Sequence, residues 1–408
     1  MPLSSKLSPD RPLSLVDPGL VNNKYEYYKW LREHSPVHVG KIAMMKVHML
    51  SRYDDCLMLM KDPRFARNRS KVTGGGRMPF PLPKSVSLLA ESMIIEDDPE
   101  HRRLRNLVQK AFAPKAVRGL EESIEAMTHE LLDAVDGHSS FELKQAYALP
   151  IPVNVIGRLV GISNADMPRF KDAVRILSEG LTGWSVLRTV AFDVPRIIKF
   201  VRELIQVKRE NPADDILTGL IEAEEGGDRL SEEELISMVF LLIIAGFETT
   251  VHLISNGVVA LTQHPEQMER LRAEPELLGS AVEEILRFNG PVHGTKMQYA
   301  REDVVLHGVT IPKGKPAVPL LGAANHDPAV FVDPEKFDVA RTPNQHLGFA
   351  QGNHFCLGAF LARMETKVAL KTLLERFPKL DLAVPFTQLK FQKIPLWHRY
   401  QAVPVKVN

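Results

Sequence analysis

The chain has 408 residues, of which 44% are hydrophobic and 25% are charged, and its 51 Lys and Arg residues balance 50 Asp and Glu residues. This composition indicates a folded protein with a sizeable core, and the near-neutral charge argues against a nucleic-acid-binding protein. The two cysteines, Cys56 and Cys356, cannot build a disulfide framework, a four-thiolate iron–sulfur cluster or a Cys-rich zinc site. This cysteine usage fits a reducing compartment, and we expect a cytoplasmic protein.

No export signal or membrane anchor is expected. The first residues lack the apolar core of a signal peptide. The most apolar stretch, residues 236–247, has 12 residues and is followed by Glu248, whereas a membrane span needs about 20 apolar residues. This stretch therefore predicts a buried core helix.

The N-terminal part of the chain combines an irregular start with a helix and a strand pair. Residues 1–20 contain four prolines and predict an irregular arm. A helix is expected over 25–33, followed by strands at 37–39 and 46–50. Residues 68–87 carry three consecutive glycines and three prolines, which is typical of a long functional loop.

Helical periodicity dominates the middle of the chain. It extends from residue 98 to 161 with interruptions at prolines, and further helices are expected over 166–181 and 194–209. A long helix over 231–263 begins with a capping box, in which a serine is followed three residues later by a glutamate.

The C-terminal part predicts a helix over 276–288, short strands within 292–321 and a last helix over 357–377. Strands and helices do not alternate regularly, as they would in a doubly wound sheet. The sequence therefore predicts a mainly α fold with small β-sheets (α+β), formed by a single domain over residues 1–408.

A glycine-punctuated loop around Cys356 immediately precedes the last predicted helix. Helix N-terminal amides stabilise anions and lower the pKa of a thiol, so Cys356 is placed to act as a thiolate. Gly352 and Gly358 allow tight turns or the close approach of a flat ligand. A lone cysteine is more often a buried structural residue, but the surrounding pattern favours a functional one.

This loop resembles the signature of the cytochrome P-450 family of haem-thiolate monooxygenases, Phe-x-x-Gly-x-(Arg/His)-x-Cys-x-Gly. The matching residues are Phe349, Gly352, His354, Cys356 and Gly358. The resemblance implies a cytochrome P-450 fold with haem b between the long helix and the cysteine loop. Cys356 would be the proximal iron ligand, whose electron donation favours O–O cleavage. Ala350, where bacterial members usually have glycine, is expected to change little.

A second resemblance is to the Glu-x-x-Arg helix of the family, here Glu284 and Arg287. Such pairs are usually solvated, but the family's pair is buried and braces the haem-binding loop. Its usual third partner is an arginine where this chain has Lys336, which lacks the planar fork of arginine. Either His346 or Arg341 is expected to complete the network.

The centre of the long helix carries unusual residues for a helix interior, namely Ala245, Gly246, Glu248 and Thr249. A glutamate in an apolar stretch is costly to bury, and a helix kink with a satisfied polar pair would be one explanation. The resemblance instead implies that this helix crosses over the haem and that Gly246 leaves room for dioxygen. Glu248 and Thr249 would be the acid–alcohol pair that delivers protons.

His101 and Arg105 stand where the family places residues that bind the haem propionates. By spacing alone they would be read as a solvated basic face. Gln298 occupies the position of a further propionate arginine of the family, and a neutral amide makes no charge-assisted contact. His101, Arg105 and His354 would therefore carry more of the propionate binding.

The resemblance also implies an apolar substrate pocket. Its candidate residues are Met78, Leu89, Leu181, Trp184, Phe240, Ile243, Val292, His293, Leu396 and Trp397. They suit an uncharged or weakly polar molecule such as a terpenoid, steroid, fatty acid or macrolide-like compound. The expected reaction inserts one oxygen atom from O2, by hydroxylation or epoxidation.

The electrons for this reaction are expected from separate proteins. The chain has no glycine motif for a dinucleotide and too few cysteines for an iron–sulfur cluster. A ferredoxin or flavodoxin with its reductase is therefore expected. Arg363, Lys367 and Lys371 form a basic stripe on which an acidic redox protein could dock, although most such stripes are solvated faces.

Two alternative functions stay open at this point. A peroxide-driven haem-thiolate enzyme would normally lack the acid–alcohol pair, which is intact here. A non-catalytic haem-binding gas sensor should carry an output domain, and one catalytic domain is expected to use all 408 residues.

Overall fold

The computed structural model describes residues 7–42, 44–76, 92–111, 119–180, 189–225 and 228–407. Its helices are α1 (Pro18–Asn22), α2 (Lys24–His34), α3 (Tyr53–Lys61), α4 (Arg69–Thr73), α6 (Glu100–Ala111), α8 (Leu120–Asp133), α9 (Pro150–Val160), α10 (Met167–Gly180), α12 (Val194–Glu210), α13 (Ile216–Glu222), α14 (Glu232–Gln263), α15 (Pro265–Ala273), α16 (Leu278–Phe288), α17 (Leu321–Ala324) and α18 (Ala359–Arg376). Its strands are β1 (Leu13–Ser14), β2 (Val37–Ile42), β3 (Met45–Leu50), β4 (Phe65–Ala66), β5 (Ser140–Glu142), β6 (Glu224–Glu225), β7 (Asp228–Arg229), β8 (Gln298–Ala300), β9 (Val304–Leu306), β10 (Val309–Ile311), β11 (Pro316–Pro319), β12 (Asp381–Leu382) and β13 (Pro404–Lys406). The mainly α fold with small sheets agrees with the prediction.

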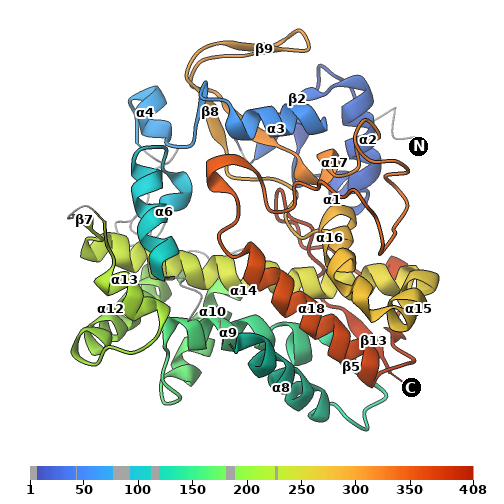
Figure 1. Cartoon of the computed structure of the whole chain (residues 1–408). Coiled ribbons are helices and arrows are strands. Elements are labelled where there is room, and N and C mark those ends of the chain that lie inside the picture. Colours follow the sequence, from blue (N-terminus) through green and yellow to red (C-terminus); the bar gives the residue numbers. More distant parts are fainter. Residues whose placement is uncertain are drawn as a thin grey trace.

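The 32-residue helix α14 crosses the middle of the molecule (Figure 1). Its predicted capping box is present, because Glu234 N donates to Ser231 Oγ at 3.2 Å and Ser231 N donates to the Glu234 carboxylate at 2.8 Å. Helices α9, α16 and α18 pack against α14. By length and composition α14 could span a membrane, but 61% of its most apolar window is buried inside the protein. This burial agrees with the predicted core helix.

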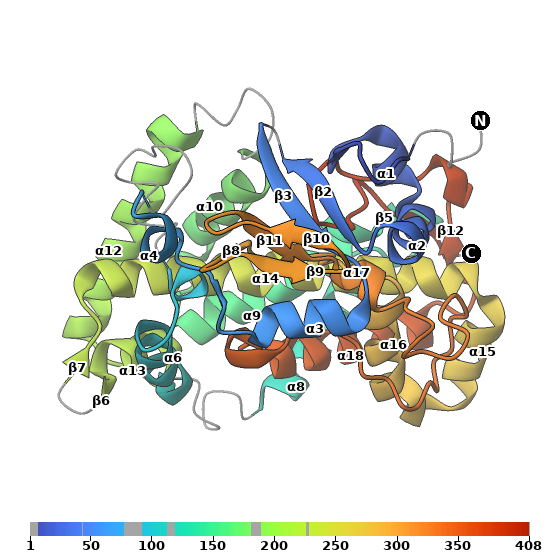
Figure 2. The ribbon, with the colours of Figure 1, turned by 90° about the horizontal axis from the view of Figure 1, so that it is seen from above.

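A mixed six-stranded sheet lies on the opposite side of α14 from helix α8 (Figure 1). Its strand order is β1-β2-β3-β11-β8-β4, with β11 parallel to β3 and antiparallel to β8 (Figure 2). At one edge, β4 pairs with β8 in the register Phe65↔Ala300 and Ala66↔Tyr299. The sheet thereby brings the N-terminal third of the chain beside the segment that follows α16.

Apolar side chains form one large cluster around α14 and two smaller clusters beside the sheet. The large cluster joins α14 to α9, α16 and α18 through residues such as Ile156, Phe247, Ile285 and Leu370. Burial of a leucine, isoleucine or phenylalanine side chain stabilises a fold by about 1.5–3 kcal/mol. This core fixes α14 against α18, the helix that begins just after Cys356.

The prediction of an irregular arm over residues 1–20 was wrong for residues 13–14 and 18–20, which lie in a strand and a helix. β1 pairs in parallel with β2, and Asp17 caps α1 by accepting from Gly19 N at 2.8 Å. Leu13 and Leu20 are buried. The prolines of this segment lie beside apolar residues without a regular period, so a periodicity search misses its docking onto the sheet.

In two other places the structure differs in detail from the sequence prediction. Strand β5 was not predicted within the helical stretch 98–161, and it pairs with β13 near the C-terminus. The predicted loop over 68–87 begins with the short helix α4, and its residues after 76 lie outside the described ranges.

Candidate active site

The loop that carries Cys356 is tightly folded against α3. Cys356 N donates to Phe349 O at 3.0 Å, and Phe355 N donates to Gly352 O at 3.0 Å. Gly352 has a φ of 76°, and a Cβ added there would lie 2.8 Å from Met60 O. Only glycine fits at this position, because both the backbone conformation and the close approach exclude a side chain.

Ala350 also adopts a left-handed backbone, with a φ of 59°. An L-residue in this conformation costs about 1–2 kcal/mol, because its Cβ crowds the following carbonyl. The expectation that alanine changes little here was wrong in energetic terms, since glycine is the residue that this conformation favours.

The thiol of Cys356 is half-buried, and burial raises its pKa in this structure. A backbone hydrogen bond from Gly358 and the positive charges of Arg105 and Arg363 act in the opposite direction. For the thiol without a bound cation, desolvation outweighs the amides and charges. The same amides and charges would favour a thiolate bound to a cation.

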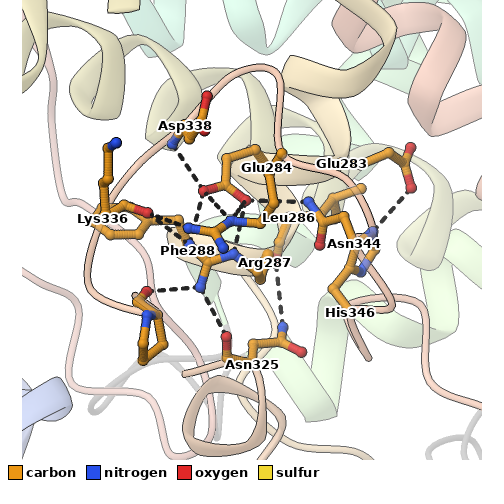
Figure 3. A network of polar contacts seen from close by, with 12 residues as sticks. Glu283, Glu284, Leu286, Arg287, Phe288, Asn325, Lys336, Asp338, Asn344 and His346 are labelled. Atoms are coloured by element: carbon orange, nitrogen blue, oxygen red, sulfur yellow. Dashed lines mark hydrogen bonds and ion pairs between the residues drawn. The ribbon is translucent and has the colours of Figure 1, made fainter. Parts of the chain in front are cut away.

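Glu284 and Arg287 of α16 form a fully buried ion pair behind this loop (Figure 3). Arg287 Nε donates to Glu284 Oε2 at 2.7 Å, and Arg287 Nη2 donates to Glu284 Oε1 at 2.8 Å. Arg287 also donates to the carbonyls of Asn325 at 3.0 Å and Pro334 at 2.8 Å. The pair thus ties α16 to the segment that leads into the cysteine loop.

Arg341 completes this network, which settles the choice that the sequence left open. Arg341 Nε donates to both carboxylate oxygens of Glu284 at 3.1 Å. Lys336 contributes its backbone carbonyl to Arg287 at 3.1 Å, while its amine points away from the network (Figure 3). His346 instead contacts Glu283, with 2.9 Å between His346 Nε2 and Glu283 Oε2.

The middle of α14 stays helical through the predicted acid–alcohol pair. Thr249 Oγ1 donates to Ala245 O at 2.8 Å. A Cβ added at Gly246 would lie 3.3 Å from Ile156 Cδ1, so the helix passes close to α9 at this point. A hydroxyl that donates one hydrogen bond can still accept others, so Thr249 can also accept a hydrogen bond from a proton donor.

Glu248 is paired with Arg399, a residue that the sequence analysis did not single out. The side chain of Arg399 is 4% exposed, and its guanidinium carbon lies 3.3 Å from the centre of the Trp397 ring. Burial lowers the pKa of Arg399, and the contact with Glu248 raises it. The only signal in the sequence is a lone arginine in an otherwise apolar and aromatic stretch, residues 394–400.

His101, Arg105 and His354 gather beside the cysteine loop from different elements. The rings of His101 and His354 are 3.9 Å apart between centroids, and burial together with the charges of Arg67, His101 and Arg105 lowers the pKa of His354 to about 2. His101 Nδ1 contacts Asp98 Oδ1 at 3.4 Å, whereas its Nε2 is buried and has no hydrogen-bond partner among the described residues. An anionic group such as a haem propionate fits this set of donors.

Part of the predicted substrate pocket lies together in the structure. Val292 and Trp397 form an isolated β-bridge, and Leu396 precedes Trp397 with a φ of 63°. Phe240 and Ile243 lie on α14, where Ile243 is buried and Phe240 is half-buried. Four candidates lie outside the described residues: Met78, Leu89, Leu181 and Trp184.

His293 is used differently from the prediction. Its ring stacks on His398 with centroids 4.8 Å apart, and its Nδ1 lies 3.1 Å from the hydroxyl of Tyr28. His293 is 2% exposed. It therefore packs in a buried aromatic cluster, and the structure does not bring it to an open pocket wall.

The predicted basic stripe on α18 is neutralised by acidic partners. Arg363 Nε donates to Glu283 at 2.6 Å. The other two amines face helix α8, where Lys367 pairs with Glu121 at 3.4 Å and Lys371 with Glu125 at 2.7 Å. The stripe is therefore not a patch of unpaired positive charge.

Comparisons with known proteins agree with this geometry. The family model "Cytochrome P-450" matches residues 23–382. The chain is 40% identical over 381 residues to cytochrome P-450 CYP107DY1 of Priestia megaterium, covering 91% of this chain and 93% of the relative. It is 34% identical over 389 residues to cytochrome P-450 monooxygenase PikC of Streptomyces venezuelae, covering 94% of this chain and 90% of the relative.

A solved structure extends the match to the whole fold. The myxobacterial cytochrome P-450 CYP267B1, in complex with myristic acid, superposes with a TM-score of 0.89 at 38% identity. The match covers 97% of this chain and 98% of that one. This chain belongs to the cytochrome P-450 family and is a monooxygenase that oxidises small molecules.

Proposed function

We propose that the protein binds haem b with Cys356 as the thiolate ligand of the iron. The observation that carries this proposal is the cysteine loop, in which Gly352 and the buried Glu284–Arg287 pair fix the backbone around the sulfur. When bound, the haem would activate O2 and supply one oxygen atom to the substrate. The residues that would surround it are His101, Arg105, Ala245, Gly246, Phe349, Gly352, His354 and Gly358.

Glu248 and Thr249 would move protons beside the haem. Thr249 Oγ1 donates to Ala245 O and keeps its lone pairs available for a proton donor. The carboxylate of Glu248, held by Arg399, can take a proton from water and pass it on towards Thr249 Oγ1. General acid assistance of this kind contributes about 10²–10⁴-fold to a rate.

The substrate would be an apolar or weakly polar small molecule. Phe240, Ile243, Val292, Leu396 and Trp397 are the described residues that support this class. Arg399 beside them carries a positive charge, but Glu248 neutralises it. The myristic acid bound to the related CYP267B1 makes fatty acids a first class to test.

The electrons would come from a ferredoxin or flavodoxin with its reductase, in the cytoplasm. Two cysteines and the absence of a dinucleotide-binding motif support separate donors. We also propose that residues 1–408 form one catalytic domain. The acid–alcohol pair favours an O2-dependent monooxygenase over a peroxide-driven enzyme or a gas sensor.

The experiment starts with a binding screen of fatty acids, steroids and macrolides, in which the shift of the haem absorption detects binding. The ligand with the largest shift is then turned over with a surrogate ferredoxin and its reductase under isotopically labelled dioxygen. We expect one labelled oxygen atom in the product. Turnover with hydrogen peroxide alone at the same rate, or a product without label, would contradict the proposal.

The Thr249→Ala variant tests the proton route in the same assay. We expect it to fold, to retain haem and to consume reductant, while much of the oxygen is released as hydrogen peroxide. Thr250→Ala is a suitable control, because Thr250 lies on the same helix and bonds Gly246 O at 3.2 Å in the same manner. Wild-type coupling in Thr249→Ala would exclude this hydroxyl from the proton route.

A further inference from the structure

Arg67 directly follows strand β4, and Gln298 is the first residue of its partner strand β8. Residues 65 and 66 pair with Ala300 and Tyr299, and Arg301 N donates to Arg64 O at 2.8 Å one position further along. Continued by one residue beyond the end of β4, the same antiparallel register would set Arg67 opposite Gln298. Directly opposed residues of antiparallel strands have their side chains on the same face of the sheet.

The guanidinium of Arg67 is buried and has few partners. The residue is 8% exposed, and burial lowers its pKa to about 10. Among the described residues, its guanidinium donates one hydrogen bond, from Nη1 to Ile94 O at 3.1 Å. Asp97 accepts from the backbone N of Arg67 at 2.8 Å. A guanidinium offers five N–H donors, so most of them lack a described partner.

Two other basic residues lie close enough to Arg67 to interact with its charge. The charge of Arg67 lowers the pKa values of both His101 and Lys296. For both residues desolvation by the surrounding protein is the larger cause, although the side chain of Lys296 is exposed. Lys296 lies two residues before Gln298.

The acids nearby are shared among several groups, and the charge of Asp97 partly offsets the lowering of the Arg67 pKa by burial. Asp97 bonds the backbone of Arg67 and lies 3.7 Å from Arg301. Asp98 contacts His101 and accepts from Arg102 at 2.7 Å. A buried cation is costly unless enough negative charge surrounds it, and Asp97 is shared between Arg67 and Arg301, so this cluster is suited to receive a further anion. The two carboxylates of a haem supply it.

We propose that Arg67 is a propionate-binding residue, which supplies across the strand pair the positive charge that Gln298 lacks. This inference rests on the proposed haem site. It assigns to β4 a part in holding the cofactor, together with His101 and Arg105 from α6. Charge-assisted hydrogen bonds of this kind contribute about 1.5–3 kcal/mol.

The test is the rate at which the purified holoenzyme loses haem to an excess of apomyoglobin. We expect Arg67→Gln to lose haem about 10- to 100-fold faster than the wild type, which corresponds to that contribution. The double variant Arg67→Gln/Gln298→Arg returns the charge to the opposed position and should recover most of the loss. Arg64→Gln is the matched control, since Arg64 is exposed and pairs with Asp62.

The melting temperatures of the holoenzyme and the haem-free protein separate binding from a purely structural role. A propionate contact lowers the melting temperature of Arg67→Gln only when haem is bound. An equal decrease in both forms, or an unchanged rate of haem loss, would overturn the inference. Failure of the proposed function is distinguishable, because the wild type itself would then lack the thiolate–CO absorption.

Discussion

The carboxylate of Glu248, at the centre of α14, is held by the guanidinium of Arg399 from the C-terminal segment. Arg399 lies over the Trp397 ring, and its Nε is buried without a partner among the described residues. The pair therefore fixes the position of the only carboxylate proposed for proton transfer. It also links that carboxylate to a residue of the candidate substrate pocket.

Arg399→Gln should slow product formation by about tenfold, because the carboxylate of Glu248 loses its anchor. Glu248→Gln should slow the proton-dependent step more than it uncouples, since it keeps the shape and loses the acid. If Arg399 acts through Glu248, the double variant is no worse than Glu248→Gln alone. Additive losses in the two single variants would show that Arg399 acts independently.

The Glu284 network predicts different effects for two neighbouring basic residues. Arg341→Ala removes donors from Glu284 and should destabilise the protein by about 1.5–3 kcal/mol. Lys336→Ala should change stability by less than about 0.5 kcal/mol, because the backbone carbonyl contact with Arg287 is kept. Urea unfolding of both variants measures the difference. Equal destabilisation would contradict the assignment of Arg341 as the third partner.

Ala350→Gly should stabilise the protein by about 0.5–1 kcal/mol. The relief of the left-handed strain outweighs the greater flexibility of glycine in the unfolded chain. Ala362→Gly, in the regular helix α18, should instead destabilise it by about 1 kcal/mol. The two melting temperatures should thus move in opposite directions, and a decrease for Ala350→Gly would refute the strain at this position.

Glu365 should make stability fall as the pH rises. Burial raises its pKa to about 8, which the contact with Thr250 offsets only in part, and its Oε2 has no described partner. Between its unfolded pKa of 4.5 and about 8, the unfolded chain ionises while the folded chain keeps the proton. The free energy of unfolding therefore decreases across this window and levels off above it.

Glu365→Gln should remove this slope, because the amide is neutral throughout. Urea unfolding between pH 5 and about pH 9 measures it. Glu375→Gln, on the same helix, is the control that should keep the wild-type slope. A slope of equal size in Glu365→Gln would show that another group titrates.

The sequence was informative where function depends on neighbours along the chain. The capping box at Ser231 predicted the start of α14, and the pattern around Cys356 predicted the loop that precedes α18. The spacing of Glu284 and Arg287 likewise predicted a pair on one helical face. Local hydrogen bonds and helical period determine these features, so a single sequence displays them.

The missed features depend on residues that are far apart in the chain. Arg399 meets Glu248 only after the C-terminal segment folds back onto α14. Arg67 comes close to the start of β8, where Gln298 lies, only through the pairing of β4 with β8. The choice of Arg341 over His346 depends on how the segment after α17 wraps around Glu284. Neither the local periodicity of the sequence nor the spacing of its residues indicates such contacts.

The most direct test of the central claim is the absorption spectrum of the reduced protein with carbon monoxide. The wild type and Cys56→Ser should both show the long-wavelength band of a thiolate-ligated haem, because Cys56 is buried and its thiol donates to the carbonyl of Leu50. Cys356→Ser should lose this band, since a neutral alcohol cannot replace the sulfur donor. If the band survives in Cys356→Ser, another residue holds the iron.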